Sequence, residues 1–166
     1  MPQLSLHSPI GDLTVSEDNG AIVAVDWGWG RDQTETPLLT RARAQLHAYF
    51  HDNAVAFDLA MAPEGTDYQK RVWAALCRIP LGQTRTYADI ARDVGGGPRS
   101  VGGANRANRI PILIPCHRVV ATSGIGGYSG GDGLPTKEYL LALETRSLQA
   151  LARQAADPPV LKPSQI

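Results

Sequence analysis

A cysteine, a histidine and an arginine follow one another at the end of an apolar stretch, as Cys116, His117 and Arg118. The stretch before them, residues 110–115, reads Ile-Pro-Ile-Leu-Ile-Pro and has the composition of a buried segment. A thiol at the end of such a segment is expected to lie in a pocket from which water is excluded. Because a neighbouring base can generate the reactive thiolate, Cys116 is the candidate nucleophile of the chain.

The histidine next to the cysteine cannot face the thiol directly, because consecutive residues point in different directions. His117 would act on Cys116 through a bridging water, or the chain would have to turn sharply here. A fall in a cysteine pKa from ~8.5 to ~6 raises the thiolate about 30-fold, but each thiolate then loses roughly tenfold in nucleophilicity. Positioning of the reactants and protonation of the leaving group must therefore supply most of the rate.

The other residues that could carry chemistry have ordinary explanations. Cys77 follows Trp73 and Leu76 in an apolar helical pattern, so we expect a core thiol. His47 and His51 are four residues apart on a predicted helix, but no Cys-x-x-Cys pair accompanies them, and we expect neither a metal site nor a cofactor. The glycine-rich loop GGYSGG lacks the Lys-Ser/Thr ending of a phosphate-binding loop.

The composition is that of a globular protein without a membrane span. The chain has 166 residues, 43% of them hydrophobic, and no apolar stretch approaches the ~20 residues that cross a bilayer. The N-terminus lacks the basic start and apolar core of a signal peptide. We therefore expect a cytoplasmic protein that does not contact membranes and keeps both cysteines as free thiols.

The net charge of zero conceals an uneven distribution. Residues 1–60 carry three arginines and eight acidic residues, a net charge of −5. Residues 81–120 carry six arginines and two aspartates, a net charge of +4. Arginine is suited to phosphate recognition, so the middle of the chain is a candidate nucleic-acid surface, with an ordinary solvated surface as the alternative.

The elements that must position these residues begin with a mixed N-terminal part. Alternating apolar residues predict four strands, at residues 4–6, 13–15, 23–27 and 55–61. An Asn19-Gly20 turn marks a hairpin, and Thr36 and Pro37 open a helix with one apolar face. Residues 1–62 are therefore expected to form a small domain.

Helical patterns follow. A capping box of Thr66 and Gln69 opens the first helix, and two short helices, 87–94 and 99–108, are joined by a glycine turn as in a helix-turn-helix. A last long helix starts at Pro135. We expect a second domain over 63–158 and a tail over 159–166.

The second short helix contains two consecutive glycines, Gly102 and Gly103. Each costs about 1 kcal/mol relative to alanine inside a helix. Their presence indicates that a partner must approach this backbone closely.

The stretches GGANRANRIPILIPCHRVV and GYSGG resemble the O6-alkylguanine-DNA alkyltransferases, also called methylated-DNA–protein-cysteine methyltransferases. The resemblance runs from about Thr66 to Glu144. It implies an α+β fold, with a small N-terminal ribonuclease-H-like α/β domain and a C-terminal, mainly helical helix-turn-helix (winged-helix-like) domain.

The same resemblance implies direct-reversal DNA repair. A methyl or other alkyl group passes from O6 of a flipped-out guanine to the protein's own cysteine, once per molecule and without a cofactor, with O4 of thymine as a further candidate. The implied partner is double-stranded DNA containing O6-alkylguanine, bound by a monomer.

The resemblance also assigns roles to residues. Cys116 matches the alkyl acceptor, His117 the residue that polarises it through water, and Glu144 the carboxylate behind the histidine. Asn108 matches the asparagine that braces the active-site turn, and Tyr87 the tyrosine beside the flipped nucleotide. On the DNA surface, Arg99 matches the arginine finger, and the second helix supplies Arg106, Gly102 and Gly103. The residues that match the guanine pocket are Val119, Tyr128 and Ser129.

Among the departures from the family pattern, two lie near the arginines. The segment from Tyr87 to Arg99 is two residues shorter than the usual spacing, so Arg106 and Arg109 stay alternative candidates for the finger. Arg109 also replaces the proline that usually follows the asparagine.

Two other functional classes stay open from the sequence. A damage-binding protein without transfer chemistry resembles the same family, but usually has tryptophan in place of Cys116. A cysteine hydrolase would need a second histidine brought to the thiol by the fold, and only His7, His47 and His51 are available.

Overall fold

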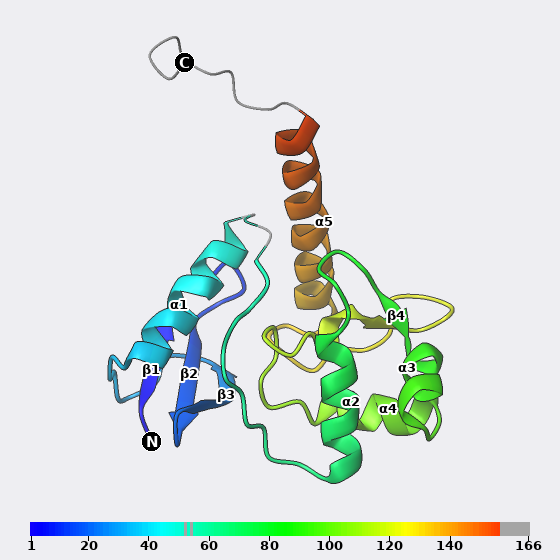
Figure 1. The fold of residues 1–166 in the computed structure, drawn as a ribbon, viewed down its shortest axis with the longest axis horizontal. Coiled ribbons are helices and arrows are strands. Elements are labelled where there is room, and N and C mark those ends of the chain that lie inside the picture. Colours follow the sequence, from blue (N-terminus) through cyan, green and yellow to red (C-terminus); the bar gives the residue numbers. More distant parts are fainter. Residues whose placement is uncertain (52, 54, 157–166) are drawn as a thin grey trace.

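The computed structural model describes residues 1–51, 53 and 55–156, and its first part is a three-stranded antiparallel sheet with one helix packed against it (Figure 1). The strands β1 (Gln3–Leu6), β2 (Leu13–Asp18) and β3 (Ala21–Trp27) lie side by side in that order. Helix α1 (Pro37–Phe50) is capped by the Thr36 side chain, as the sequence predicts. Its buried residues are Leu39, Ala42, Leu46, Tyr49 and Phe50.

The predicted hairpin is confirmed, whereas the fourth predicted strand is wrong. Asn19 and Gly20 take positive φ angles of 50° and 78° between β2 and β3, which suits a tight hairpin turn. Residues 55–61 form no strand, and only Met61 makes an isolated bridge, to Ile22. Part of the outer edge of β3 is occupied by another segment, because the Val25 amide donates to the carbonyl of Arg109 (3.0 Å). This part of the edge is therefore closed to a fourth strand.

Three packed helices form the next part of the chain. Helix α2 (Asp67–Cys77), helix α3 (Tyr87–Val94) and helix α4 (Pro98–Arg106) contact one another pairwise. The capping box predicted for α2, between Thr66 and Gln69, is present, and a second one opens α3. The turn between α3 and α4 uses Gly95 and Gly96 at φ angles of 92° and 74°, so these two helices form the predicted helix-turn-helix.

The Cys-His-Arg segment is held between this helical part and a long last helix. It forms a 3-10 turn, η1 (Cys116–Arg118), and leads into β5 (Val119–Val120). Strand β5 pairs in parallel with β4 (Arg85–Thr86), directly before Tyr87. This short sheet therefore brings the start of α3 next to Cys116. Helix α5 (Leu134–Ala156) packs on η1 and then projects away from the rest of the molecule (Figure 1).

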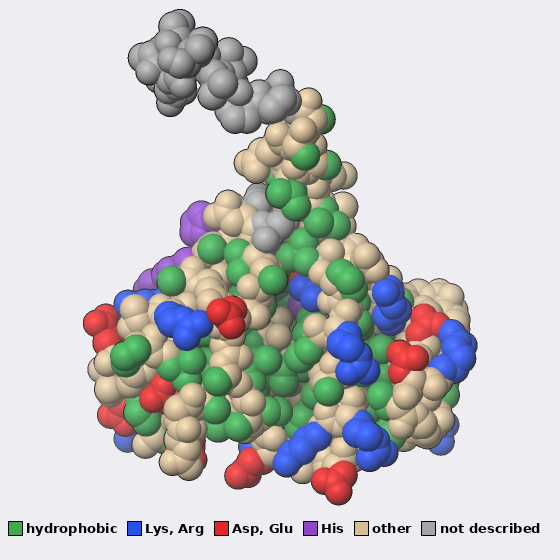
Figure 2. Space-filling model, viewed as in Figure 1, with side chains coloured by type: hydrophobic (Ala, Val, Ile, Leu, Met, Phe, Trp, Pro, Cys, Tyr) green, Lys and Arg blue, Asp and Glu red, His purple; other side chains and the backbone are tan. Residues whose placement is uncertain are grey.

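The expected α+β architecture, a small N-terminal sheet unit followed by a mainly helical unit, is confirmed. One continuous apolar core joins the two units. On the face drawn in Figure 2, Lys and Arg side chains gather over the half that contains α2 and its neighbours, and apolar side chains line the seam. The tail expected at 159–166 lies outside the described residues.

Within the part of the chain that the structure describes, no helix has both the length and the hydropathy needed to span a lipid bilayer.

Candidate active site

The turn that precedes Cys116 is strained and firmly braced. Ile112 is fully buried and has a φ of 73°, in the left-handed region that a β-branched residue rarely adopts. Asn108 holds the turn from both ends: its side-chain amide donates to the carbonyl of Ile114 (2.8 Å), and its Oδ1 accepts from the amide of Ile110 (3.0 Å). The bracing position expected for Asn108 is therefore the one it occupies, and the turn fixes where Cys116 lies.

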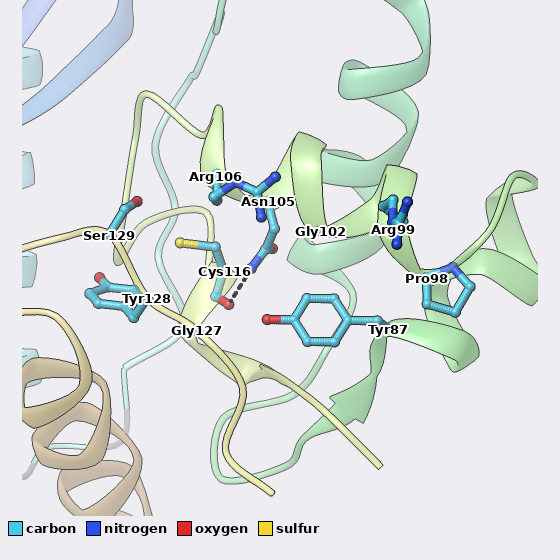
Figure 3. A pocket seen from close by; sticks show the side chains of 10 residues that line it. All are labelled: Tyr87, Pro98, Arg99, Gly102, Asn105, Arg106, Cys116, Gly127, Tyr128 and Ser129. Carbon is cyan, nitrogen blue, oxygen red and sulfur yellow. Dashed lines mark hydrogen bonds between the residues drawn. The ribbon is translucent and has the colours of Figure 1, made fainter. Parts of the chain in front are cut away.

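Cys116 lies in the wall of a cavity of about 450 Å³ between the helix-turn-helix and the glycine-rich loop (Figure 3). Its side chain points toward Tyr128 and Ser129, while the ring of Tyr87 approaches from the opposite side. Arg99 lies beside Pro98 and Tyr87, across the cavity from Ser129. The cavity is lined by Tyr87, Pro98, Arg99, Gly102, Asn105, Arg106, Cys116, Gly127, Tyr128 and Ser129.

A second cavity, of about 560 Å³, adjoins the first at Cys116. It shares Tyr128 and Ser129 with the first cavity and continues between Trp27 of β3 and Arg109. Cys116 therefore borders both cavities, and the N-terminal unit supplies part of the wall of the second.

Two asparagines contact Cys116, and burial sets the protonation state of its thiol. Asn105 is buried and donates from Nδ2 to the backbone carbonyl of Cys116 (3.1 Å; Figure 3). Burial raises the pKa of the Cys116 thiol above its ordinary value, although a hydrogen bond with Asn108 and the charge of Lys137 oppose the shift. The thiol is thus protonated at neutral pH, and a base must take its proton when it reacts.

The histidine next to the thiol is part of a fully buried hydrogen-bond chain. Nε2 of His117 lies 2.6 Å from Oε2 of Glu144. Arg118 donates to the same carboxylate twice, from Nε to Oε1 (2.8 Å) and from Nη2 to Oε2 (3.0 Å). Burial opposes ionisation of Glu144, but hydrogen bonds and ion pairs with His117 and Arg118 hold its pKa well below the usual range. The carboxylate is therefore ionised, and Nε2 of the imidazole carries the proton that it accepts.

The other nitrogen of this imidazole is available for chemistry. Nδ1 of His117 is buried and has no hydrogen-bond partner among the described residues. Burial lowers the pKa of His117, and the opposing effect of Glu144 does not reverse the shift. A neutral ring with a proton on Nε2 leaves Nδ1 as a hydrogen-bond acceptor, the form that can take a proton from a thiol.

A buried lysine secures the loop on the far side of the cavity. Lys137 is fully buried, and its Nζ donates to the carbonyls of Val119 (2.7 Å) and Gly127 (3.1 Å). Burial lowers the pKa of Lys137 to about 8, and the neighbouring Cys116 opposes this shift. The ammonium thus ties the loop that carries Tyr128 and Ser129 to β5.

The structure brings together most of the residues expected at the site, but it places Val119 and Cys77 differently from what the sequence predicted. Val119 does not line the cavity; its side chain is fully buried in β5, and only its carbonyl is engaged by Lys137. Cys77 was expected in the core, but it is exposed at the last position of α2, because the apolar face of that helix is formed by Val72, Trp73 and Leu76. Arg118 donates to the carbonyl of Ile79 and forms an ion pair with Glu144.

The two glycines of α4 face open space. A Cβ on Gly103 would meet no atom within 4 Å, and one on Gly102 would make only ordinary contacts with Arg106 and Tyr87. None of the described residues therefore requires glycine at Gly103.

Three residues of the site were missed by sequence reasoning: Asn105, Lys137 and Tyr49, whose hydroxyl donates to Glu144 (2.6 Å). A signal for Lys137 exists, because it lies two helical turns before Glu144 and shares the buried face with Leu140. Tyr49 had no such signal, since it continues an apolar helix face 95 positions away from its partner.

Comparison with known proteins gives one consistent result. The profile described as "6-O-methylguanine DNA methyltransferase, DNA binding domain" matches residues 67–146, and the one described as "6-O-methylguanine DNA methyltransferase, ribonuclease-like domain" matches residues 4–63. The methylated-DNA–protein-cysteine methyltransferase of Methanosarcina barkeri is 43% identical over 155 residues, covering 87% of this chain and 97% of that protein. The constitutive enzyme of the same name from Bacillus subtilis is 39% identical over 152 residues, covering 83% of this chain and 92% of its own length.

Solved structures agree with these relatives. The crystal structure of Mycobacterium tuberculosis OGT in complex with DNA superposes with a TM-score of 0.79 at 37% identity, covering 89% of this chain and 94% of that one.

The protonated state of the buried thiol leads to a prediction about its reactivity. Because the pKa of Cys116 is raised, the thiolate fraction should increase steadily with pH through neutrality and up to pH ~9, about tenfold per unit. The rate of carboxamidomethylation of Cys116 by iodoacetamide, measured by mass spectrometry in the Cys77→Ser protein, should follow that increase. A plateau reached below neutral pH would show an activated thiolate and contradict the prediction.

Proposed function

The chain belongs to the 6-O-methylguanine DNA methyltransferase family, and we propose that Cys116 is the residue on which it accepts the alkyl group. Its activity is direct-reversal repair of DNA, as a methylated-DNA–protein-cysteine methyltransferase. The observation that supports Cys116 is its place in the wall of the 450 Å³ cavity, next to the helix-turn-helix and directly before His117, which pairs with Glu144.

Repair requires the damaged base to leave the duplex, because O6 of a paired guanine is blocked inside the stack. The cavity opens between α3 and α4, where Tyr87, Arg99 and Gly102 line it, so a base rotated out beside the helix-turn-helix can enter. Arg99 is exposed at the start of α4 and is our candidate for the side chain that fills the gap in the duplex. Arg106 is also exposed, at the end of α4, where it lines both cavities and fits a contact to the phosphate or the base.

The transfer step is a displacement at the alkyl carbon. The sulfur of Cys116 forms the new S–C bond while the C–O6 bond breaks, and the thiol proton passes through a water molecule to Nδ1 of His117. Glu144 stabilises the resulting imidazolium through Nε2. Burial raises the pKa of Tyr87, although a hydrogen bond with the backbone of Gly127 opposes the shift, so its hydroxyl keeps the proton that guanine O6 needs on leaving.

The remaining contacts hold the base and the alkyl group. Tyr128 has a buried hydroxyl without a partner among the described residues, and burial keeps its pKa far above the ordinary value, so it can donate to the guanine. Ser129 lies beside it, and the adjoining cavity leaves room for the alkyl group. The product is a thioether, and no residue of the site can displace it, so each molecule acts once.

Two further assignments complete the proposal. We assign residues 1–62 to a ribonuclease-H-like domain, 63–158 to the DNA-binding and acceptor domain and 159–166 to a tail, in line with the profile matches to 4–63 and 67–146. We place the protein in the cytoplasm, where two free thiols stay reduced.

The acceptor assignment predicts a single labelled residue. After incubation with duplex DNA containing O6-methylguanine, mass spectrometry should find one methyl group per molecule, on Cys116 and not on the exposed Cys77. Cys116→Ser should abolish transfer and retain DNA binding, while Cys77→Ser should transfer normally. A label on Cys77, or demethylation beyond one equivalent, would refute the assignment.

The glycines of α4 give a test that separates folding from DNA binding. Gly103→Ala should raise the free energy of unfolding by up to about 1 kcal/mol, because alanine favours a helix and its Cβ meets open space. It should nevertheless weaken binding to duplex DNA, measured by fluorescence anisotropy, and leave transfer from the free base O6-benzylguanine unchanged. A stabilised protein that binds DNA as before would mean that no DNA approaches this backbone.

Arg99 should matter only for a base that must be flipped. Arg99→Ala should slow single-turnover transfer from duplex DNA by about 100-fold, corresponding to the few kcal/mol of unstacking, and leave transfer from O6-benzylguanine unaffected. Arg153→Ala removes the same charge from the projecting end of α5 and should change neither rate. Equal losses on both substrates would instead give Arg99 a role in pocket integrity.

A further inference from the structure

A tyrosine of the N-terminal unit reaches into the buried chain behind the acceptor cysteine. Tyr49 lies on α1 and is only 1% exposed, and its hydroxyl is 2.6 Å from Oε2 of Glu144 on α5. The same oxygen is 2.6 Å from Nε2 of His117 and 3.0 Å from Nη2 of Arg118. Three donors from two segments of the chain, α1 and η1, therefore share one carboxylate oxygen.

Packing does not explain the hydroxyl of Tyr49. Its ring lies 5.2 Å from that of Phe50 and 5.4 Å from that of Phe57, measured between centroids, and a phenylalanine would make both contacts. A buried hydroxyl is unfavourable unless it forms a hydrogen bond. Burial, followed by the charge of Glu144, raises the pKa of Tyr49 well above its ordinary value, so the hydroxyl stays protonated and donates.

The consequence for His117 follows from the shared oxygen. Each donor that binds Oε2 takes up part of its negative charge and so weakens the pull of Glu144 on the proton of Nε2. The groups that face the imidazole or its partner are Glu144 and Lys137 from α5, Arg118 from η1 and Tyr49 from α1. Tyr49 is the only one of these contributed by the N-terminal unit.

We infer that Tyr49 is a positioning residue for alkyl transfer: by donating to Oε2 of Glu144, it limits how strongly that carboxylate holds His117 and so keeps Nδ1 free to accept the thiol proton. The inference rests on the proposed role of His117 as the proton acceptor. It makes the N-terminal sheet unit a contributor to the chemistry, in addition to its contribution to the core.

The test is the pH dependence of transfer in the Tyr49→Phe protein. Without the hydroxyl, Glu144 attracts the imidazole proton more strongly, which raises the pKa of His117. Protonated His117 cannot accept the thiol proton, so transfer is lost as pH falls through that pKa. The acid-side midpoint of single-turnover transfer from free O6-benzylguanine, which needs no DNA, should therefore move up by about one pH unit.

Tyr139→Phe is the matched control, because it removes a tyrosine hydroxyl from the helix that carries Glu144 without touching the carboxylate. Its midpoint should equal that of the unmodified protein. A Tyr49→Phe protein that has a lower melting temperature but an unchanged midpoint would give Tyr49 a purely structural role and overturn the inference.

A second substitution keeps the test informative if Tyr49→Phe does not fold. In a protein with 3,5-difluorotyrosine at position 49, the more acidic hydroxyl forms a stronger hydrogen bond with Glu144. The acid-side midpoint of transfer should then move to lower pH, opposite to the shift in Tyr49→Phe. An unmoved or raised midpoint would overturn the inference. Loss of transfer in the unmodified protein, or transfer to a residue other than Cys116, would refute the proposed function itself. Normal transfer with an unmoved midpoint in the variants would refute only the role of Tyr49.

Discussion

The site depends on one buried carboxylate, that of Glu144. An isolated charge is strongly disfavoured in a protein interior, and it is tolerated only when paired and hydrogen-bonded. Here the partners come from α1, from η1 and from the loop before β4, where the Gly82 amide approaches Oε1 at 3.4 Å. Glu144 can therefore be buried only when the two units and the Cys-His-Arg turn are assembled around it, which couples folding of the chain to formation of the site.

The turn before Cys116 shows a similar coupling in the backbone. Ile112 adopts a left-handed conformation that costs of order 1–3 kcal/mol, and such strain persists only where the surroundings enforce it. Asn108 and the apolar core supply that enforcement, and Asn105 fixes the carbonyl of Cys116 itself. The backbone of Cys116 is thus held in place before any DNA arrives, which agrees with a reaction that relies on placement of the reactants more than on a preformed thiolate.

The DNA-facing part obeys different constraints. The helix-turn-helix exposes Arg99 and Arg106 and leaves open space over Gly103, so it offers a surface that external phosphates and bases can approach. Residues 1–60 carry eight of the 16 acidic residues against three arginines, a net charge of −5. A protein with a net charge of zero can therefore present a basic region to DNA.

The sequence by itself determined much of the local structure, because caps, turns and apolar periodicity act over a few residues. It was sufficient for the Asn19-Gly20 hairpin, the capped helices, the helix-turn-helix and the family match around Cys116. It failed for residues 55–61, which form no strand because another segment occupies part of the edge of β3. It also failed for Cys77, which is exposed because of the way α2 is oriented. Only the tertiary structure joined Tyr49 and Lys137 to the site, because their hydrogen bonds connect segments that are distant in sequence, and no local pattern encodes which buried polar group will meet which partner.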